Sequence, residues 1–126
     1  MTDSELIQLS RKAAQNAYAP YSRFPVGAAL ECDDGTVYTG CNVENAAYGS
    51  TICAERTALV KAVSEGHTRF VRIAVSGAGT KICTPCGACR QMLAEFSPKM
   101  EVLCAGADGE YARYLLSELL PHSFDF

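Results

Sequence analysis

Three cysteines in two separate segments place the strongest constraint on how this chain can fold. The first segment reads Cys53-x-Glu55, and the second reads Pro85-Cys86-x-x-Cys89. Three thiolates can hold one zinc ion tetrahedrally and leave its fourth position to a water molecule. A nearby carboxylate can then move the protons of that water. We therefore expect the fold to bring both segments together around one metal ion.

Composition favours one small domain. The chain has 126 residues, of which 48% are hydrophobic, so we expect a single domain over residues 1–126 with one buried core. Its net charge is −3 and it has no basic run, which argues against binding to a nucleic-acid backbone. No apolar run approaches the roughly 20 residues that span a bilayer, so no membrane partner is expected.

The N-terminus and the cysteines indicate where the protein works. Residues 1–5 are polar and acidic, unlike a secretion signal. Without such a signal, seven cysteines are more typical of metal ligands and buried thiols than of a disulfide framework. We therefore expect a cytoplasmic protein.

The first half of the chain predicts a helix followed by a β-hairpin. Thr2 and Glu5 have the spacing of a capping box, and the helix that they begin should end before Pro20. Its apolar face is expected to consist of Leu6, Leu9, Ala13 and Ala17. Residues 26–32 and 36–42 are predicted strands joined by an Asp-Asp-Gly turn, and a polar loop follows them.

A second helix is predicted from about residue 53 to residue 65, where Gly66 ends it. Its apolar face contains Ala58, Leu59 and Ala62. Glu55 falls on the same face, and a carboxylate that points at a core is costly unless something there uses it. We therefore take Glu55 as the candidate catalytic residue.

The second half of the chain alternates strands with a helix. Strands are predicted at 70–76 and 102–105, and between them a third helix should begin with Thr84 as its cap and Pro85 as its first residue. Residues 110–116 predict a last strand, although a helix over 111–120 fits as well. This alternation indicates an α/β fold, a three-layer α/β/α sandwich on a mixed five-stranded sheet.

The cysteines also have simpler interpretations. Taken alone, Cys86 and Cys89 fit a redox dithiol or half of a structural zinc site. A structural site would close with a fourth protein ligand, and the candidates are Cys32, Cys41, Cys83 and Cys104. Three of these fall within or at the end of predicted strands and are expected to be small core residues. Glu55 favours the catalytic interpretation, because a closed structural site has no use for a carboxylate.

The charge of such a site needs compensation. One zinc ion with three thiolates carries one net negative charge, which weakens it as a Lewis acid. The positive ends of two helices would offset part of that charge. Arg56 can also donate hydrogen bonds to a thiolate, as groups around a metal ligand often do. The simpler interpretation of Arg56 is a surface ion pair.

Several motifs, in order along the chain, resemble those of the small cytidine deaminases. They are A-P-Y-S-x-F-x-V-G-A-A at 19–29, G-C-N-V-E-N-A-A-Y-G at 40–49, C-A-E-R-T-A at 53–58, P-C-G-A-C-R-Q at 85–91 and L-L-P-x-S-F at 119–124. The resemblance covers nearly the whole chain. It implies hydrolytic deamination of cytidine and deoxycytidine to uridine and deoxyuridine with release of ammonia, a reaction of pyrimidine salvage.

The resemblance also implies roles for the cysteines and for Glu55. Cys53, Cys86 and Cys89 match the ligands of one zinc ion per chain. Glu55 matches a glutamate that takes a proton from the zinc-bound water and delivers it to the pyrimidine ring nitrogen, while hydroxide attacks C4. The same carboxylate then helps to protonate the departing amino group. Metal binding would lower the pKa of water from ~15.7 towards neutrality.

Other residues match those that bind the nucleoside. Asn42 and Glu44 match residues that hydrogen-bond the ribose 3′-hydroxyl. Phe24 matches an aromatic residue that packs on the pyrimidine, and the backbone N–H of Ala54 is implied as a donor to the base carbonyl. Without the resemblance, we would interpret Asn42 as a turn residue, Glu44 as a solvated charge and Phe24 as part of the core.

The resemblance implies a homotetramer whose pockets are completed by neighbouring chains. Tyr48 and Phe124 match positions that contribute across subunits, and Phe126 is a second candidate for the role of Phe124. The alternatives are a blasticidin-type deaminase, a deaminase of RNA or DNA, and a zinc-stabilised module without catalysis. The 42–48 loop argues against the first, and the acidic balance argues against the second. Glu55 argues against the third.

Overall fold

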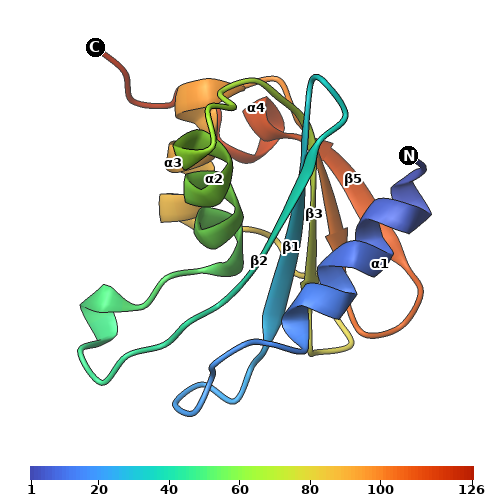
Figure 1. Cartoon of the computed structure of the whole chain (residues 1–126), viewed down its shortest axis with the longest axis vertical. Helices are drawn as coiled ribbons and strands as arrows, with labels where there is room; N and C mark the ends of the chain where they lie inside the picture. Colours follow the sequence, from blue (N-terminus) through green and yellow to red (C-terminus); the bar gives the residue numbers. More distant parts are fainter.

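A mixed sheet with strand order β2-β1-β3-β4-β5 forms the centre of the structure, a computed structural model that describes residues 1–126 (Figure 1). The strands are β1 (Val26–Cys32), β2 (Val37–Cys41), β3 (Phe70–Gly77), β4 (Glu101–Ala105) and β5 (Tyr111–Leu115). β3 and β4 pair in parallel, with Ala74 opposite Leu103, and all other pairs are antiparallel. The predicted mixed five-stranded sheet is confirmed.

Helices cover both faces of this sheet. α1 (Asp3–Ala14) lies on one face, and α2 (Ala54–Ser64) and α3 (Gly87–Phe96) lie on the other (Figure 1). The short helix α4 (Leu116–Leu119) follows β5 directly. A 3-10 turn, η1 (Tyr48–Ser50), projects from the connection between β2 and α2. The predicted α/β/α sandwich is therefore confirmed. None of the helices has the length and apolar character that crossing a bilayer requires.

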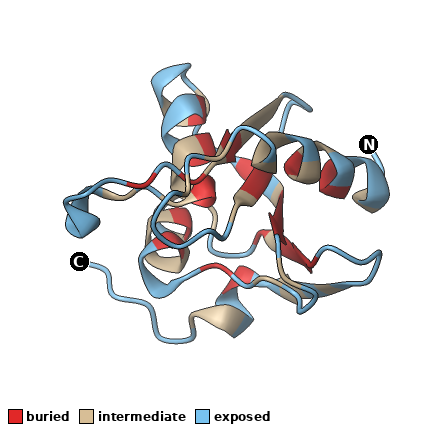
Figure 2. Ribbon diagram, turned by 90° about the horizontal axis from the view of Figure 1, so that it is seen from below, coloured by how far each residue is buried: buried red, intermediate tan, exposed pale blue.

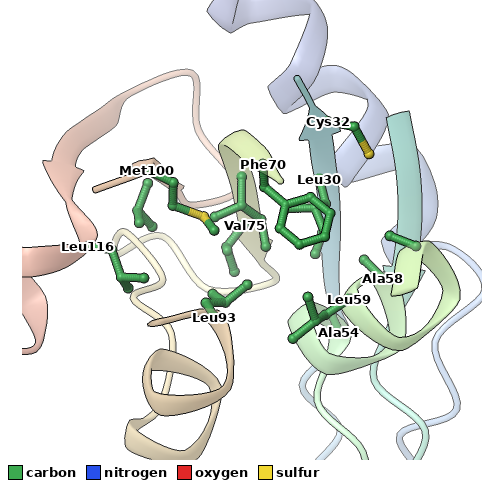
Figure 3. Packing of buried hydrophobic residues seen from close by; sticks show 14 of the residues in the cluster. Leu30, Cys32, Ala54, Ala58, Leu59, Phe70, Val75, Leu93, Met100 and Leu116 are labelled. Atoms are coloured by element: carbon green, nitrogen blue, oxygen red, sulfur yellow. The ribbon is translucent and has the colours of Figure 1, made fainter. Parts of the chain in front are cut away.

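Alternate residues of the central strands β1, β3 and β4 belong to two separate cores, because successive side chains of a strand point to opposite faces. The larger core lies between the sheet and the helices α2 and α3, and Figure 3 shows it with Leu30, Val75, Leu59, Leu93 and Leu116. The smaller core lies under α1 and consists of Leu6, Ile7, Ala29, Ala74, Leu103 and Ala105. These cores fix α2 and α3 on the same side of the sheet, where the predicted metal ligands lie.

The first helix begins as predicted and is shorter than its proline limit. The N–H of Glu5 donates to Thr2 Oγ1 over 3.1 Å, and the N–H of Thr2 donates to Glu5 Oε1 over 3.3 Å, so the capping box is present. The helix ends at Ala14, well before Pro20. Pro20 is therefore not the residue that ends this helix.

The buried face of α1 differs in part from the predicted one. Leu6 is buried, whereas Leu9, Ala13 and Ala17 are only half-buried. Ile7 and Ser10 are buried in their place. Burial of Ser10 is possible because its hydroxyl donates to the carbonyl oxygen of Ile7 over 2.6 Å and shares a hydrogen bond with Ser76.

The strands of the second half agree with the prediction to within one residue, whereas the start of α3 differs from it. α3 begins at Gly87 with Cys86 as its N-cap, so the prediction of Thr84 as the cap was wrong by two residues. Cys86 stays extended, at φ −68° and ψ 169°, which delays the first helical residue. The two interpretations of the chain after residue 110 each describe a part of it, because β5 ends where α4 begins.

Candidate active site

The N-termini of α2 and α3 bring the three predicted metal ligands together. Cys53 is the N-cap of α2 and Cys86 is the N-cap of α3, and both have extended backbones. Cys89 lies in the first turn of α3 and is fully buried. Local structure thus pairs Cys86 with Cys89, and the packing of both helices against one face of the sheet adds Cys53.

The spacing of the three sulfur atoms fits a tetrahedral zinc ion. The Sγ atoms of Cys53 and Cys86 are 3.8 Å apart, those of Cys86 and Cys89 are 3.4 Å apart, and all three lie within 4.8 Å of one another. Two thiolates bound to one tetrahedral zinc ion are about 3.8 Å apart, given a Zn–S distance of about 2.3 Å. No fourth histidine, cysteine or carboxylate belongs to this group. The donor set therefore fits one zinc ion with one corner left for another molecule.

Hydrogen-bond donors around Cys53 stabilise the ionised form of its thiol. A side-chain nitrogen of Arg56, Nη2, donates to Cys53 Sγ over 3.4 Å and also reaches the carbonyl oxygen of Thr51. The hydrogen bond from the Cys89 thiol lowers the pKa of Cys53 to about 5, and the hydrogen bond from Arg56 acts in the same direction. The first-turn N–H groups of α2 and α3 add partial positive charge. Arg56 is half-buried against a thiol and is not a surface ion pair.

Glu55 is buried beside this cluster. It is only 4% exposed and shares its helix face with the buried Ala58, Leu59 and Ala62, as predicted. Burial, with a smaller contribution from the negative charge of Cys53, raises the pKa of Glu55 to about 7. A carboxylate in this environment can exist in both protonation states near neutral pH, which a group that accepts and returns a proton requires.

A cavity of about 270 Å³ joins Glu55 and the cysteines to the residues predicted to hold a nucleoside. Its walls are formed by Ser22, Phe24, Val26, Asn42, Glu44, Thr51, Cys53, Ala54, Glu55, Cys83, Thr84 and Cys86. A second hollow of about 340 Å³ is lined by Tyr21 and Tyr48 and shares Ser22, Glu44 and Thr51 with the first. The site is therefore an elongated depression with the thiols at one end.

Asn42 holds the backbone on both sides of Pro25. Its Nδ2 donates to the carbonyl oxygen of Phe24 over 3.0 Å, and its Oδ1 accepts from the N–H of Val26 over 2.9 Å. Phe24 keeps 39% of its surface exposed, and its ring lies against Gly77 and Gly79. Asn42 is therefore more than a turn residue, because it fixes the backbone of Phe24, whose side chain lines the cavity.

Glu44 is buried and fully anchored. Its Oε1 accepts from the N–H groups of Tyr21 and Ser22 over 2.9 Å and 3.0 Å, and its Oε2 accepts from the Ser22 hydroxyl. The Ser22 hydrogen bonds hold the pKa of Glu44 below its usual value. The interpretation of Glu44 as a solvated charge is therefore wrong, since the 19–24 segment wraps around its carboxylate.

The remaining predicted contacts occupy different places. Ala54 is the first residue of α2, so its N–H at the cavity wall has no partner within the helix. Tyr48 is 73% exposed on η1 and lines only the second hollow. Phe124 is 68% exposed, stacks edge-on with Phe126 and lines neither hollow. Within one chain, the structure does not bring Phe124 to the site.

Sequence reasoning missed three polar residues of the cavity wall. Thr51 and Thr84 each precede a predicted ligand by two residues, and this repeated offset was an available signal. Ser22 lies two residues before Phe24, and nothing in the local sequence showed that it would contact Glu44. The other cysteines are not ligands of the cluster: Cys32 and Cys104 are buried, Cys41 and Cys83 are half-buried, and Cys83 lines the cavity.

Three thiols beside a buried carboxylate on an α/β/α frame define a zinc-binding deaminase. Comparison with known families agrees, since the family described as cytidine and deoxycytidylate deaminase zinc-binding region matches residues 1–105. The chain belongs to this family of cytidine and deoxycytidylate deaminases.

Individual relatives cover nearly the whole chain. A cytidine deaminase of Sporosarcina psychrophila is 49% identical over 98% of this chain and 92% of its own length. One of Halalkalibacterium halodurans is 50% identical over 94% of this chain and 91% of its own length. The crystal structure of a cytidine deaminase from Burkholderia pseudomallei superimposes with a TM-score of 0.95 at 46% identity, covering 98% of this chain and 100% of that one.

Proposed function

We propose that this protein hydrolyses the C4 amino group of cytidine and deoxycytidine, yielding uridine or deoxyuridine and ammonia in pyrimidine salvage. The observation that carries the proposal is the burial of Glu55 at the cavity wall beside three thiols spaced for one zinc ion. Membership of the family and the names of its relatives support the same reaction.

Cys53, Cys86 and Cys89 would hold one zinc ion per chain, and that ion supplies the Lewis acidity that makes water a nucleophile near neutral pH. Glu55 accepts a proton from the attacking water and passes it to the ring nitrogen of the base. It next helps to protonate the departing amino group, so that ammonia leaves and a carbonyl remains at C4. One carboxylate serves both steps because it stays within reach of the same carbon.

The walls of the cavity suit the two halves of a nucleoside. The exposed face of Phe24 would provide an apolar surface for the pyrimidine, and the N–H of Ala54 would donate to its carbonyl; both residues line the cavity. Asn42 retains one N–H donor and Glu44 retains one lone pair after their internal hydrogen bonds are counted. A sugar hydroxyl can accept from Asn42 and donate to Glu44 at the same time.

A direct assay tests this function. The purified protein is mixed with cytidine, and the change in absorbance and the release of ammonia are followed together. We expect turnover that disappears after treatment with a strong zinc chelator and returns with added zinc. Zinc-loaded protein that releases no ammonia from cytidine or deoxycytidine would contradict the proposal.

We also propose that four copies assemble and share their active sites. Figure 2 shows exposed segments, η1 and the C-terminal tail, projecting from the same side of the molecule. Tyr48, Phe124 and Phe126 lie on these segments and are largely exposed, and apolar side chains that gather on one side of a molecule often mark an interaction site. The mass in solution, measured by light scattering, checks this assembly. Monomers at micromolar concentration that remain fully active would exclude shared sites.

Two further proposals concern the chain as a whole. We propose that residues 1–126 form a single domain, since both cores lie against the same sheet; one cooperative unfolding transition is the expected result. We also propose a cytoplasmic location, because seven free thiols suit a reducing compartment. Localisation of a tagged protein by cell fractionation checks the second proposal.

A further inference from the structure

A second group of metal-binding side chains lies far from the zinc site. Cys32 Sγ, a carboxylate oxygen of Asp34 and a ring nitrogen of His67 lie within 4.8 Å of one another. Cys32 ends β1, whereas Val26 at the start of β1 lines the active-site cavity, and a strand of this length spans roughly 20 Å. Figure 1 shows the β1–β2 turn and the connection from α2 to β3 at the same end of the molecule.

The β1–β2 turn fixes two of the three groups. The N–H of Gly35 donates to the carbonyl oxygen of Cys32 over 3.0 Å, and Gly35 adopts the left-handed φ of 90° that closes the turn. The N–H of Thr36 donates to Asp34 Oδ1 over 3.0 Å. This leaves Asp34 Oδ2 to face His67, 3.1 Å from its Nε2 atom. Figure 3 shows Cys32 at the margin of the larger core, beside Leu30 and Phe70.

The end of α2 fixes the third group. Gly66 has a φ of 96°, and the N–H of His67 donates to the carbonyl oxygen of Ala62 over 2.9 Å, which holds His67 against the helix end. The Tyr38 hydroxyl is hydrogen-bonded to Nδ1 of His67 over 3.1 Å. Metal-binding histidines typically have one ring nitrogen held by a hydrogen bond, while the other nitrogen faces the metal and its other ligands.

We propose that Cys32, Asp34 and His67 form a second site for a divalent transition metal, with zinc as the best-suited ion. One thiolate, one carboxylate and one imidazole are common zinc ligands. Two nitrogen or oxygen ligands of a tetrahedral zinc ion lie about 3.3 Å apart, close to the observed separation of His67 and Asp34. The thiolate and the carboxylate neutralise the two positive charges, and water takes the fourth corner.

Binding exchanges bonds without any oxidant or reductant. A metal–sulfur bond replaces the S–H bond of Cys32, and its proton goes to solvent. The proton that His67 Nε2 shares with Asp34 moves to Nδ1, which then donates to the Tyr38 hydroxyl oxygen. The hydrogen bond between His67 and Asp34 is thereby given up for two metal–ligand bonds. With one thiolate in place of three, this site should bind zinc more weakly than the active site does. The protein as isolated should therefore carry one zinc ion and accept a second only from added metal.

Metal counting tests the proposal independently of catalysis. The zinc-loaded protein is equilibrated with excess zinc chloride, passed through a desalting column and measured for metal per chain. A parallel titration with cobalt chloride follows the absorption band of thiolate-bound cobalt. We expect the wild type to rise from one metal ion to two, and Cys32→Ser, Asp34→Asn and His67→Gln to remain at one. The three variants should deaminate cytidine at the same rate as the wild type.

Matched controls separate this site from loose surface binding. Cys41→Ser and His122→Gln remove another thiol and the other histidine, and both should still take up two ions. Asp34→Asn keeps the hydrogen bond to Thr36, so it serves if Cys32→Ser unfolds. The proposal is overturned if the wild type stops at one ion, or if Asp34→Asn and His67→Gln bind two. A control variant that still binds two metal ions but no longer deaminates cytidine would have a damaged active site and would leave the second metal site supported.

Discussion

The side-chain amide of Asn42 donates a 3.0 Å hydrogen bond to the carbonyl oxygen of Phe24. A residue predicted to hold the sugar thus also fixes the aromatic residue predicted to hold the base. The two contacts to the nucleoside are therefore coupled through the protein, and a change at Asn42 should affect both.

Asn42→Ala should lower kcat/KM for cytidine by about 10- to 100-fold, because backbone groups near Phe24 and Val26 lose their partner and the sugar loses a donor. Turnover of free cytosine should fall as well, although less. Steady-state kinetics with both substrates checks this expectation, with the exposed Asn16→Ala as the control. Unchanged cytosine turnover would show that Asn42 acts on the sugar alone.

Glu55→Gln should lower kcat by about 10²- to 10⁴-fold, because the amide cannot carry the proton. The variant should keep one zinc ion per chain, since Glu55 does not belong to the thiol cluster. Its thermal stability should equal or exceed that of the wild type, because a buried charge is removed. Kinetics, metal analysis and a melting curve measure the three quantities. Loss of zinc from the variant would show that Glu55 is a metal ligand.

Arg56→Ala should weaken zinc binding by about 10- to 100-fold, since the hydrogen bond to Cys53 that stabilises the thiolate is lost. Competition with a chromophoric chelator measures the affinity. Arg69→Ala, at an exposed position, controls for the loss of one positive charge. Equal affinities of the two variants would mean that Arg56 acts only through general electrostatics.

The contribution of Glu44 to stability should depend on pH. Hydrogen bonds from Ser22 lower the pKa of Glu44 from its usual value of 4.5 in the folded protein, so folding favours the ionised form. The resulting stabilisation is present above pH 4.5 and disappears as the pH falls through the lowered pKa. Urea unfolding of wild type and Glu44→Gln should therefore differ at neutral pH and converge in acid. If the difference in unfolding free energy between the two proteins grew in acid, the pKa of Glu44 would be raised in the folded protein and not lowered.

Gly40 lets α2 lie directly on β2. A Cβ atom at this position would stand 2.6 Å from both the carbonyl oxygen of Ala54 and the N–H nitrogen of Ala58. Gly40→Ala should therefore destabilise the fold by about 1–3 kcal/mol and also lower activity, because α2 carries Cys53 and Glu55. Gly49→Ala, which meets no atom within 4 Å, is the control. Equal unfolding midpoints of the two variants would exclude a close contact.

Local rules predicted the elements that depend on neighbours in sequence. The capping box of Thr2 and Glu5, the left-handed Gly66 that ends α2, and the apolar face shared by Glu55 and Leu59 are all present. Such features follow from hydrogen bonds and spacings within one or two helical turns. The start of α3 was predicted two residues too early, because Cys86 and not Thr84 takes the extended backbone of the N-cap residue.

By itself, the sequence determined the type of the elements, the three thiols and the carboxylate on the inner face of α2. Only the tertiary structure decided that Cys53 lies 3.8 Å from Cys86, and that Glu44 is wrapped by Tyr21 and Ser22. Helical periodicity relates residues a few positions apart, whereas contacts between distant segments depend on how two helices pack against one sheet. The same packing brought His67, at the end of α2, to Cys32 and Asp34 in the β1–β2 turn, a grouping that no local pattern had predicted.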